Sequence, residues 1–167
     1  MHGNTLQIEY VKLSELNAYQ PSPRVHPVGQ RRKARAILER YGQAVPILID
    51  ENNIIVDGHL IADEWKALGN EQIGAVVVRG RSNEEIRALR LALNRLPQDG
   101  KWDPSKLKAE FEALIAIGYD LDLTAFDAVE IEVTLTIDDP SGAVVEDAPP
   151  TVAPDAVAVS RLGDRWA

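Results

Sequence analysis

Ile55-Val56-Asp57-Gly58-His59 is the stretch that decides the fold. A β-branched run ends in Asp-Gly-His, and Leu60–Leu68 then carries apolar residues at helical spacing before Gly69, a typical helix stop. A strand that turns directly into a helix brings backbone N–H groups and the positive end of the helix dipole to one point, which favours a phosphate there. The turn is therefore the first candidate site. Asp-Gly is also common in ordinary turns, so a purely structural role stays open.

Each residue of this turn has a chemical use. Gly58 would let the backbone approach a phosphate closely, and His59 could donate to a phosphate oxygen or accept a proton. Asp57 could hold a metal or orient His59. Asp57 and His59 are thus the candidate catalytic residues, and all three are candidates for phosphate binding.

The elements before the turn are predicted from their apolar spacing. Val45–Ile49 and Asn53–Val56 indicate a hairpin joined by a polar turn, and the alternation in Leu6–Val11 predicts a half-buried strand. Val28–Tyr41 has helical spacing and is followed by Gly42. Together with the helix after the turn, these elements indicate an α+β fold, a small mixed sheet with packed helices.

The elements after the turn continue this pattern. Ile73–Val78 is rich in β-branched residues and predicts another strand. Ser82 and Glu85 form a capping-box pair that opens a helix closed by Pro97. Two segments then follow: a helical extension, residues 101–137, which begins with the N-cap pair Asp103-Pro104, and an acidic Pro/Ala-rich linker, residues 138–167.

Charge is divided unevenly along the chain. The formal net charge is −8, but residues 1–109 carry +3 and residues 110–167 carry −11. Within the first part, residues 21–41 hold six basic side chains against one acidic one, which predicts an anion-facing patch or a solvated helix face. The basic residues predicted to contact DNA are Arg31, Arg32, Lys33 and Arg35, and Arg24 is predicted to contact phosphate.

Other polar residues give weaker signals. Asn94 and Arg95 lie near a helix C-terminus and are candidates for phosphate binding, although capping alone would satisfy Arg95. Trp65 and Trp102 could stack on bases, but Trp65 shares a stripe with apolar residues and is expected in the core. The adjacent carboxylates Asp63-Glu64 and Glu84-Glu85 diverge on a helix and are expected at the surface.

Composition excludes some chemistry. The chain has no cysteine, which rules out a thiol nucleophile, a Cys-ligated zinc and an iron–sulfur cluster. Apolar runs are too short for a membrane span, and the first residues do not form a signal peptide, so we expect a cytoplasmic protein with no membrane contact.

The order of these segments resembles the ParB/sulfiredoxin-like superfamily over roughly residues 5–100. The matching passages are Pro21-Ser22-Pro23-Arg24, residues 36–42 with 45–49, and residues 55–59 with 67–69. Residues 91–96 and Trp102-Asp103 are similar to a stretch of phage and bacterial members that precedes a DNA-modifying methyltransferase, and residues 161–166 resemble the approach to such a domain. The resemblance assigns residues 1–100 to a ParB-like domain.

The resemblance implies a DNA-associated module that binds CTP or ATP, with Mg²⁺, between the glycine box and the arginine segment. Some family members are described as nucleases, and a homodimer is one of the assemblies that the sequence leaves open. Two positions depart from the pattern: Ile61 stands where an arginine commonly meets the phosphates, and Leu93 replaces the acidic residue before Asn94. Sulfiredoxin activity is excluded because its cysteine is absent.

Three hypotheses follow. The first is a noncatalytic or weakly nucleotide-hydrolysing module that targets or regulates a C-terminal methyltransferase domain of the same parent chain. The second is a metal-dependent nuclease or a phosphotransferase that uses Asp57 and His59. The third is an interaction scaffold, in which the acidic residues 110–137 dock on another protein or shield the basic face.

Overall fold

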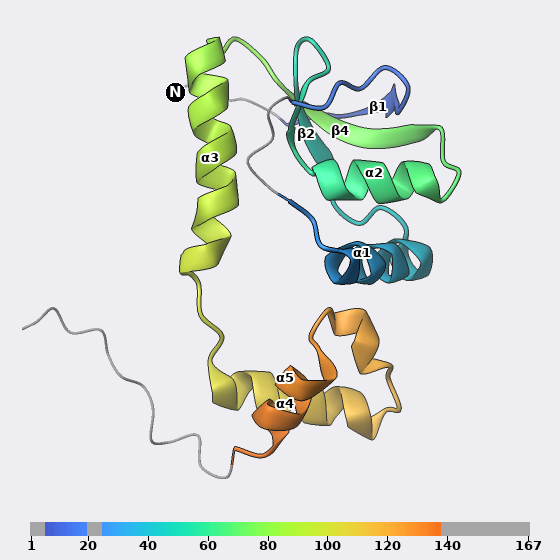
Figure 1. Ribbon diagram of the computed structural model, residues 1–167, viewed down its shortest axis with the longest axis vertical. Coiled ribbons are helices and arrows are strands. Elements are labelled where there is room, and N and C mark those ends of the chain that lie inside the picture. The colour runs from blue at the N-terminus through green and yellow to red at the C-terminus, as the bar shows by residue number, and fades with distance from the viewer. Residues whose placement is uncertain (1–5, 20–24, 138–167) are drawn as a thin grey trace, which may run out of the picture. The chain divides into compact units, whose positions relative to one another are not determined.

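The computed structural model describes residues 6–19 and 25–137. In these ranges the chain forms a four-stranded sheet with packed helices, as the sequence indicates (Figure 1). Its strands are β1 (Ile8–Lys12), β2 (Ile47–Asp50), β3 (Ile55–Asp57) and β4 (Gln72–Val78), in the order β1-β4-β2-β3. Strand β4 pairs antiparallel with β1 and parallel with β2, and β2 pairs antiparallel with β3. The predicted α+β class and mixed sheet are confirmed.

The helices follow the sequence pattern closely. Helix α1 (Val28–Tyr41) has the bounds that the periodicity predicts, and α2 (His59–Ala67) begins directly at the Asp-Gly-His turn. Next along the chain come α3 (Asn83–Asp99), α4 (Pro104–Ala116), a 3-10 turn η1 (Leu121–Thr124) and α5 (Ala128–Leu135). No helix within the described ranges has the length and apolarity that crossing a bilayer requires.

The core lies between the sheet and α2. Ile47, Ile49 and Ile73 are fully or almost fully buried, and Trp65 of α2 packs against them as expected. The indole N–H of Trp65 donates to the carbonyl oxygen of Gln72 at 2.9 Å. Ile55 of β3 belongs to the same cluster, and because burial of one such isoleucine contributes about 2 to 3 kcal/mol, the cluster holds the strand that leads into the turn.

Strand β1 differs from its prediction. We expected a half-buried strand, but Ile8 and Tyr10 are 59% and 76% exposed, and only Val11 of the strand is partly buried. Leu13, just past its end, joins the core. Strand β1 lies at the edge of the sheet, and its Val11 packs against the core together with Trp65 of α2. Because side chains alternate along a strand, Ile8 and Tyr10 lie on the other face of the sheet, which α2 does not cover (Figure 1).

A side chain extends the pairing of β4. Strand β2 begins to pair with β4 at Ala75, so the backbone of Gly74 has no strand partner on that side. Gln43 takes this place, because its Nε2 donates to the Gly74 carbonyl at 2.7 Å and its Oε1 accepts the Gly74 N–H at 2.7 Å. A Cβ atom at position 74 would lie 3.2 Å from that Oε1, so glycine permits the close contact.

The caps predicted for α3 and α4 are confirmed, but the predicted end of α3 is wrong. Ser82 and Glu85 form the expected capping box of α3, and Asp103 caps α4 through the N–H groups of Ser105 and Lys106. Pro97 does not close α3, which continues to Asp99. Pro97 lies only two residues before the end of α3, so its missing N–H and the clash of its ring disturb only the last turn of the helix.

Candidate phosphate-binding site

The Asp57-Gly58-His59 turn lies in a cavity of about 300 Å³ between the sheet, α2 and α3. Gly58 caps α2 in the left-handed conformation with φ of 93°, and a Cβ atom there would lie 2.6 Å from Cγ2 of Ile47. A side chain at this position is therefore excluded by strain and by contact. No side chain caps α2 and its first turn holds no carboxylate, so the N–H groups of that turn remain available to an anion.

His59 faces the cavity from the first position of α2. Its Nε2 atom is buried and has no hydrogen-bond partner among the described residues. Desolvation lowers the pKa of His59, and the positive charge of Arg90 lowers it further, while Asp63 and Asp57 act in the opposite direction. The imidazole is therefore neutral at pH 7, and its unpaired nitrogen can donate to or accept from a ligand, depending on the tautomer.

Arg90 of α3 is the cation of this cavity, and it was not among the residues predicted from the sequence. It is only 4% exposed, its guanidinium lies 3.6 Å from the ring centroid of Tyr19, and its Nη2 donates to the Ile55 carbonyl at 3.4 Å. Its Nε has no hydrogen-bond partner, and no carboxylate of the described residues lies within ion-pair distance. A signal was present, since Arg90 stands four residues after buried Ile86 and four before Asn94, on one helix face.

The three remaining residues predicted to bind phosphate have different positions. Asn94 lines the cavity with Asp57, and its Nδ2 donates to the Arg90 carbonyl at 2.8 Å. Arg95 points elsewhere, because it is mostly exposed and pairs with Asp99 one turn along α3. Arg24 lies outside the described residues. The structure thus brings together Asp57, Gly58, His59 and Asn94 but not Arg95.

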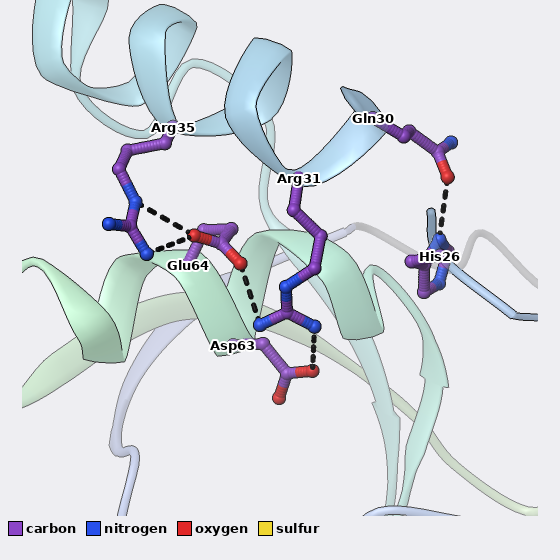
Figure 2. A network of polar contacts seen from close by, with 6 residues as sticks. All are labelled: His26, Gln30, Arg31, Arg35, Asp63 and Glu64. Atoms are coloured by element: carbon purple, nitrogen blue, oxygen red, sulfur yellow. Dashed lines mark hydrogen bonds and ion pairs between the residues drawn. The ribbon is translucent and has the colours of Figure 1, made fainter. Parts of the chain in front are cut away.

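The basic residues of α1 do not form one open patch. Arg31 and Arg35 both turn toward α2 and bind Glu64, with nitrogen–oxygen distances of 2.7 Å each (Figure 2). Lys33 pairs with Asp127 at 2.6 Å. Of the four residues predicted to contact DNA, only Arg32 is without an ion-pair partner in the described part of the chain.

Glu64 corrects another prediction. The sequence places the pair Asp63-Glu64 at the surface, but Glu64 is 0% exposed, while Asp63 remains exposed and lies 3.7 Å from Arg31. The reason is tertiary, because two arginines on α1 supply the opposite charge that a buried carboxylate needs (Figure 2). This cluster fastens α1 to α2, the helix whose N-terminus forms the cavity.

Metal ligands are sparse in this region. Across residues 6–19 and 25–137, no three His, Asp or Glu side chains are grouped so that they could hold a metal ion. Asp57 is exposed at the cavity and would need further ligands from a bound nucleotide to hold Mg²⁺.

The comparisons with known proteins agree on one kind of relative. Residues 105–162 match the family model of the ParB-methyltransferase HTH domain. The chain is 29% identical, over 80 residues, to the ParB-like nuclease domain-containing protein YnaK of Escherichia coli (strain K12). The aligned residues cover 48% of this chain and 92% of YnaK.

A solved structure extends the likeness to the fold. The chromosome-partitioning protein ParB of Caulobacter crescentus, C-terminally truncated and complexed with CTP-gamma-S, superimposes with a TM-score of 0.64. The match covers 77% of each chain at 12% sequence identity, so it shows a shared fold.

Proposed function

We propose that this chain, which belongs to the ParB-like superfamily, binds the phosphate groups of a nucleotide in the cavity of the Asp57-Gly58-His59 turn and acts as a DNA-associated module. CTP is the first ligand to test, because the Caulobacter ParB of the same fold was crystallised with CTP-gamma-S. ATP is the alternative that the family resemblance implies.

Arg90 is the observation that carries this proposal. The Arg90 guanidinium is 96% buried, lies over an aromatic ring and donates to one carbonyl oxygen, and no carboxylate of the described residues lies within the ion-pair distance that a buried cation normally has. A phosphate in the adjoining cavity would supply that charge and accept a charge-assisted hydrogen bond from Nε. Arg90 would thus take the part that an arginine at position 61 plays in relatives, where this chain has Ile61.

The turn would supply the remaining contacts. The N–H groups at the start of α2 point toward the same cavity end as Gly58, and the helix dipole favours an anion there. His59 would donate through its unpaired Nε2 in the matching tautomer. Asp57 and Asn94 lie at the cavity wall, where they would contact a nucleotide or its Mg²⁺.

Methyltransferase association is the second part of the proposal. It is supported by the family model that matches residues 105–162, whose description joins ParB to a methyltransferase. We propose that the module directs or regulates a DNA methyltransferase, in the same parent chain or in a separate one. Co-purification and methylation assays with the parent protein, in the presence and absence of the module, would test this part.

Calorimetric titration of the chain with CTP, ATP and inorganic phosphate tests the site. Arg90→Gln should weaken binding about 10- to 100-fold, because it removes a charge-assisted hydrogen bond of about 1.5 to 3 kcal/mol. Arg95→Gln is the matched control, since it removes an arginine of the same helix that faces away from the cavity. Equal affinities of the two variants, or no binding by the unmodified chain, would refute the proposal.

Nuclease activity is the competing function, favoured by the name of the Escherichia coli relative and by the joint presence of Asp57 and His59 in the cavity. The chain is incubated with supercoiled plasmid and Mg²⁺ or Mn²⁺. Cleavage that disappears in Asp57→Ala would establish it, and cleavage that persists in this variant would point to a contaminant.

A further inference from the structure

The acidic unit, defined as residues 120–132, meets the basic helix α1 through Asp122 and Asp127. This unit contains η1 and the first part of α5, and it carries five carboxylates and no basic side chain: Asp120, Asp122, Asp127, Glu130 and Glu132. Helix α1 carries five basic side chains and one acidic one. The two segments are therefore complementary in charge.

Their contact is built from side chains of both signs. Nζ of Lys33 lies 2.6 Å from Oδ1 of Asp127. Arg32 and Lys33 line a cavity of about 430 Å³ together with Asp122 and Asp127, so two cations and two carboxylates share one cavity. At the far end of α1, the hydroxyl of Tyr41 contacts the hydroxyl of Tyr119, just before the acidic unit.

The other side of α1 is already neutralised. Arg31 and Arg35 bind the buried carboxylate of Glu64 and are committed to the fold (Figure 2). Lys33 pairs instead with the acidic unit, and Arg32, which has no ion-pair partner among the described residues, lines the same cavity as Asp122 and Asp127.

The segment that matches the HTH family model has the wrong charge for phosphate contact. Residues 105–162 contain three basic and twelve acidic residues, a net charge of −9. Lys106 pairs with Asp103, and Nζ of Lys108 donates to the carbonyl oxygen of Ile137. Since duplex binding depends on cations that neutralise phosphates, α1 offers the better contact surface.

We infer that the acidic unit occupies the surface through which Arg32 and Lys33 would meet a nucleic-acid backbone, so that duplex DNA and the acidic unit compete for these two side chains. The carboxylates of Asp122 and Asp127 stand where DNA phosphates would lie. This inference rests on the proposed DNA association, and it means that the acidic unit lowers the affinity of the chain for DNA.

The test compares two double variants with the same change in net charge, by fluorescence anisotropy on a labelled duplex. Asp122→Asn/Asp127→Asn removes the carboxylates at α1, and Asn caps a helix as well as Asp does, so α5 is retained. Glu112→Gln/Glu132→Gln removes two exposed carboxylates of α4 and α5 that do not line the shared cavities.

The first variant should bind DNA about tenfold more tightly at about 50 mM salt, and its salt slope should steepen by about 1.8, as expected for two added phosphate contacts. Adding Lys33→Met to it should cancel much of the gain. The control variant should stay within about twofold of the unmodified chain, because it leaves Asp122 and Asp127 in place beside Arg32 and Lys33.

The remaining outcomes separate the two proposals. An equal gain in both variants would show a general charge effect and overturn the inference. Binding by the unmodified chain without any gain in the first variant would also overturn it, while DNA association stands. No binding by any of the proteins at low salt would overturn both.

Discussion

Replacing Glu64 with glutamine is expected to lower the free energy of unfolding by about 2 to 3 kcal/mol. The carboxylate is 0% exposed and binds Arg31 through one oxygen and Arg35 through the other. Breaking a fully buried ion pair costs about 3 to 5 kcal/mol. The two arginine side chains are 41% and 47% exposed, so both can turn to water once the charge is lost, which reduces the cost.

The measurement is equilibrium unfolding in urea, with the slope used to verify that only stability has changed. Asp63→Asn is the control, because Asp63 is exposed and lies 3.7 Å from Arg31, and it should cost less than about 0.5 kcal/mol. If Glu64→Gln costs no more than Asp63→Asn, the cluster does not hold α1 against α2 and the reasoning from burial is wrong.

Three further predictions concern the turn and its helices. Gly58→Ala should destabilise the fold by more than about 1 kcal/mol and abolish phosphate binding, since the new methyl group would contact Ile47; unfolding and calorimetric titration measure both. Because the pKa of His59 is lowered in the folded chain, the unfolded chain takes up a proton at this residue more readily below about pH 6.5. The free energy of unfolding should therefore fall as the pH drops from about 6.5 toward the pKa of His59 in the folded chain. Melting curves from pH 8 to pH 5 should show this fall, and His59→Gln should reduce it. Ser82→Ala should cost about 1 kcal/mol in urea unfolding, because it removes the capping box of α3; a change near zero would contradict the cap's contribution.

Local patterns account for the elements that the sequence predicted. Helix α1 has its predicted bounds because apolar spacing and Gly42 act within one segment, and the Asp57-Gly58-His59 turn follows from a single strand–helix junction. Strand β1 was predicted as an element but not in its exposure, because edge position depends on the order of strands in the sheet.

The candidate site was predicted only in part, because its charges meet across elements. In the sequence Arg90 is one of several charged residues of an amphipathic helix, and its burial follows only from the packing of α3 against β3. Glu64 was assigned to the surface because its partners, Arg31 and Arg35, belong to another helix. Arg95 was assigned to the phosphate site from its neighbour Asn94, although successive residues on a helix point about 100° apart.

The two hydrogen bonds between Gln43 and Gly74 also bear on whether the chain associates with other chains at high protein concentration. A stretch of β4 backbone without a strand partner would be a template for strand addition by another chain, which is a common first step in aggregation. The amide of Gln43 satisfies both backbone groups of Gly74 and closes that template with one side chain. Neither backbone group of Gly74 is therefore left for pairing with another chain, at the place where β2 does not reach β4.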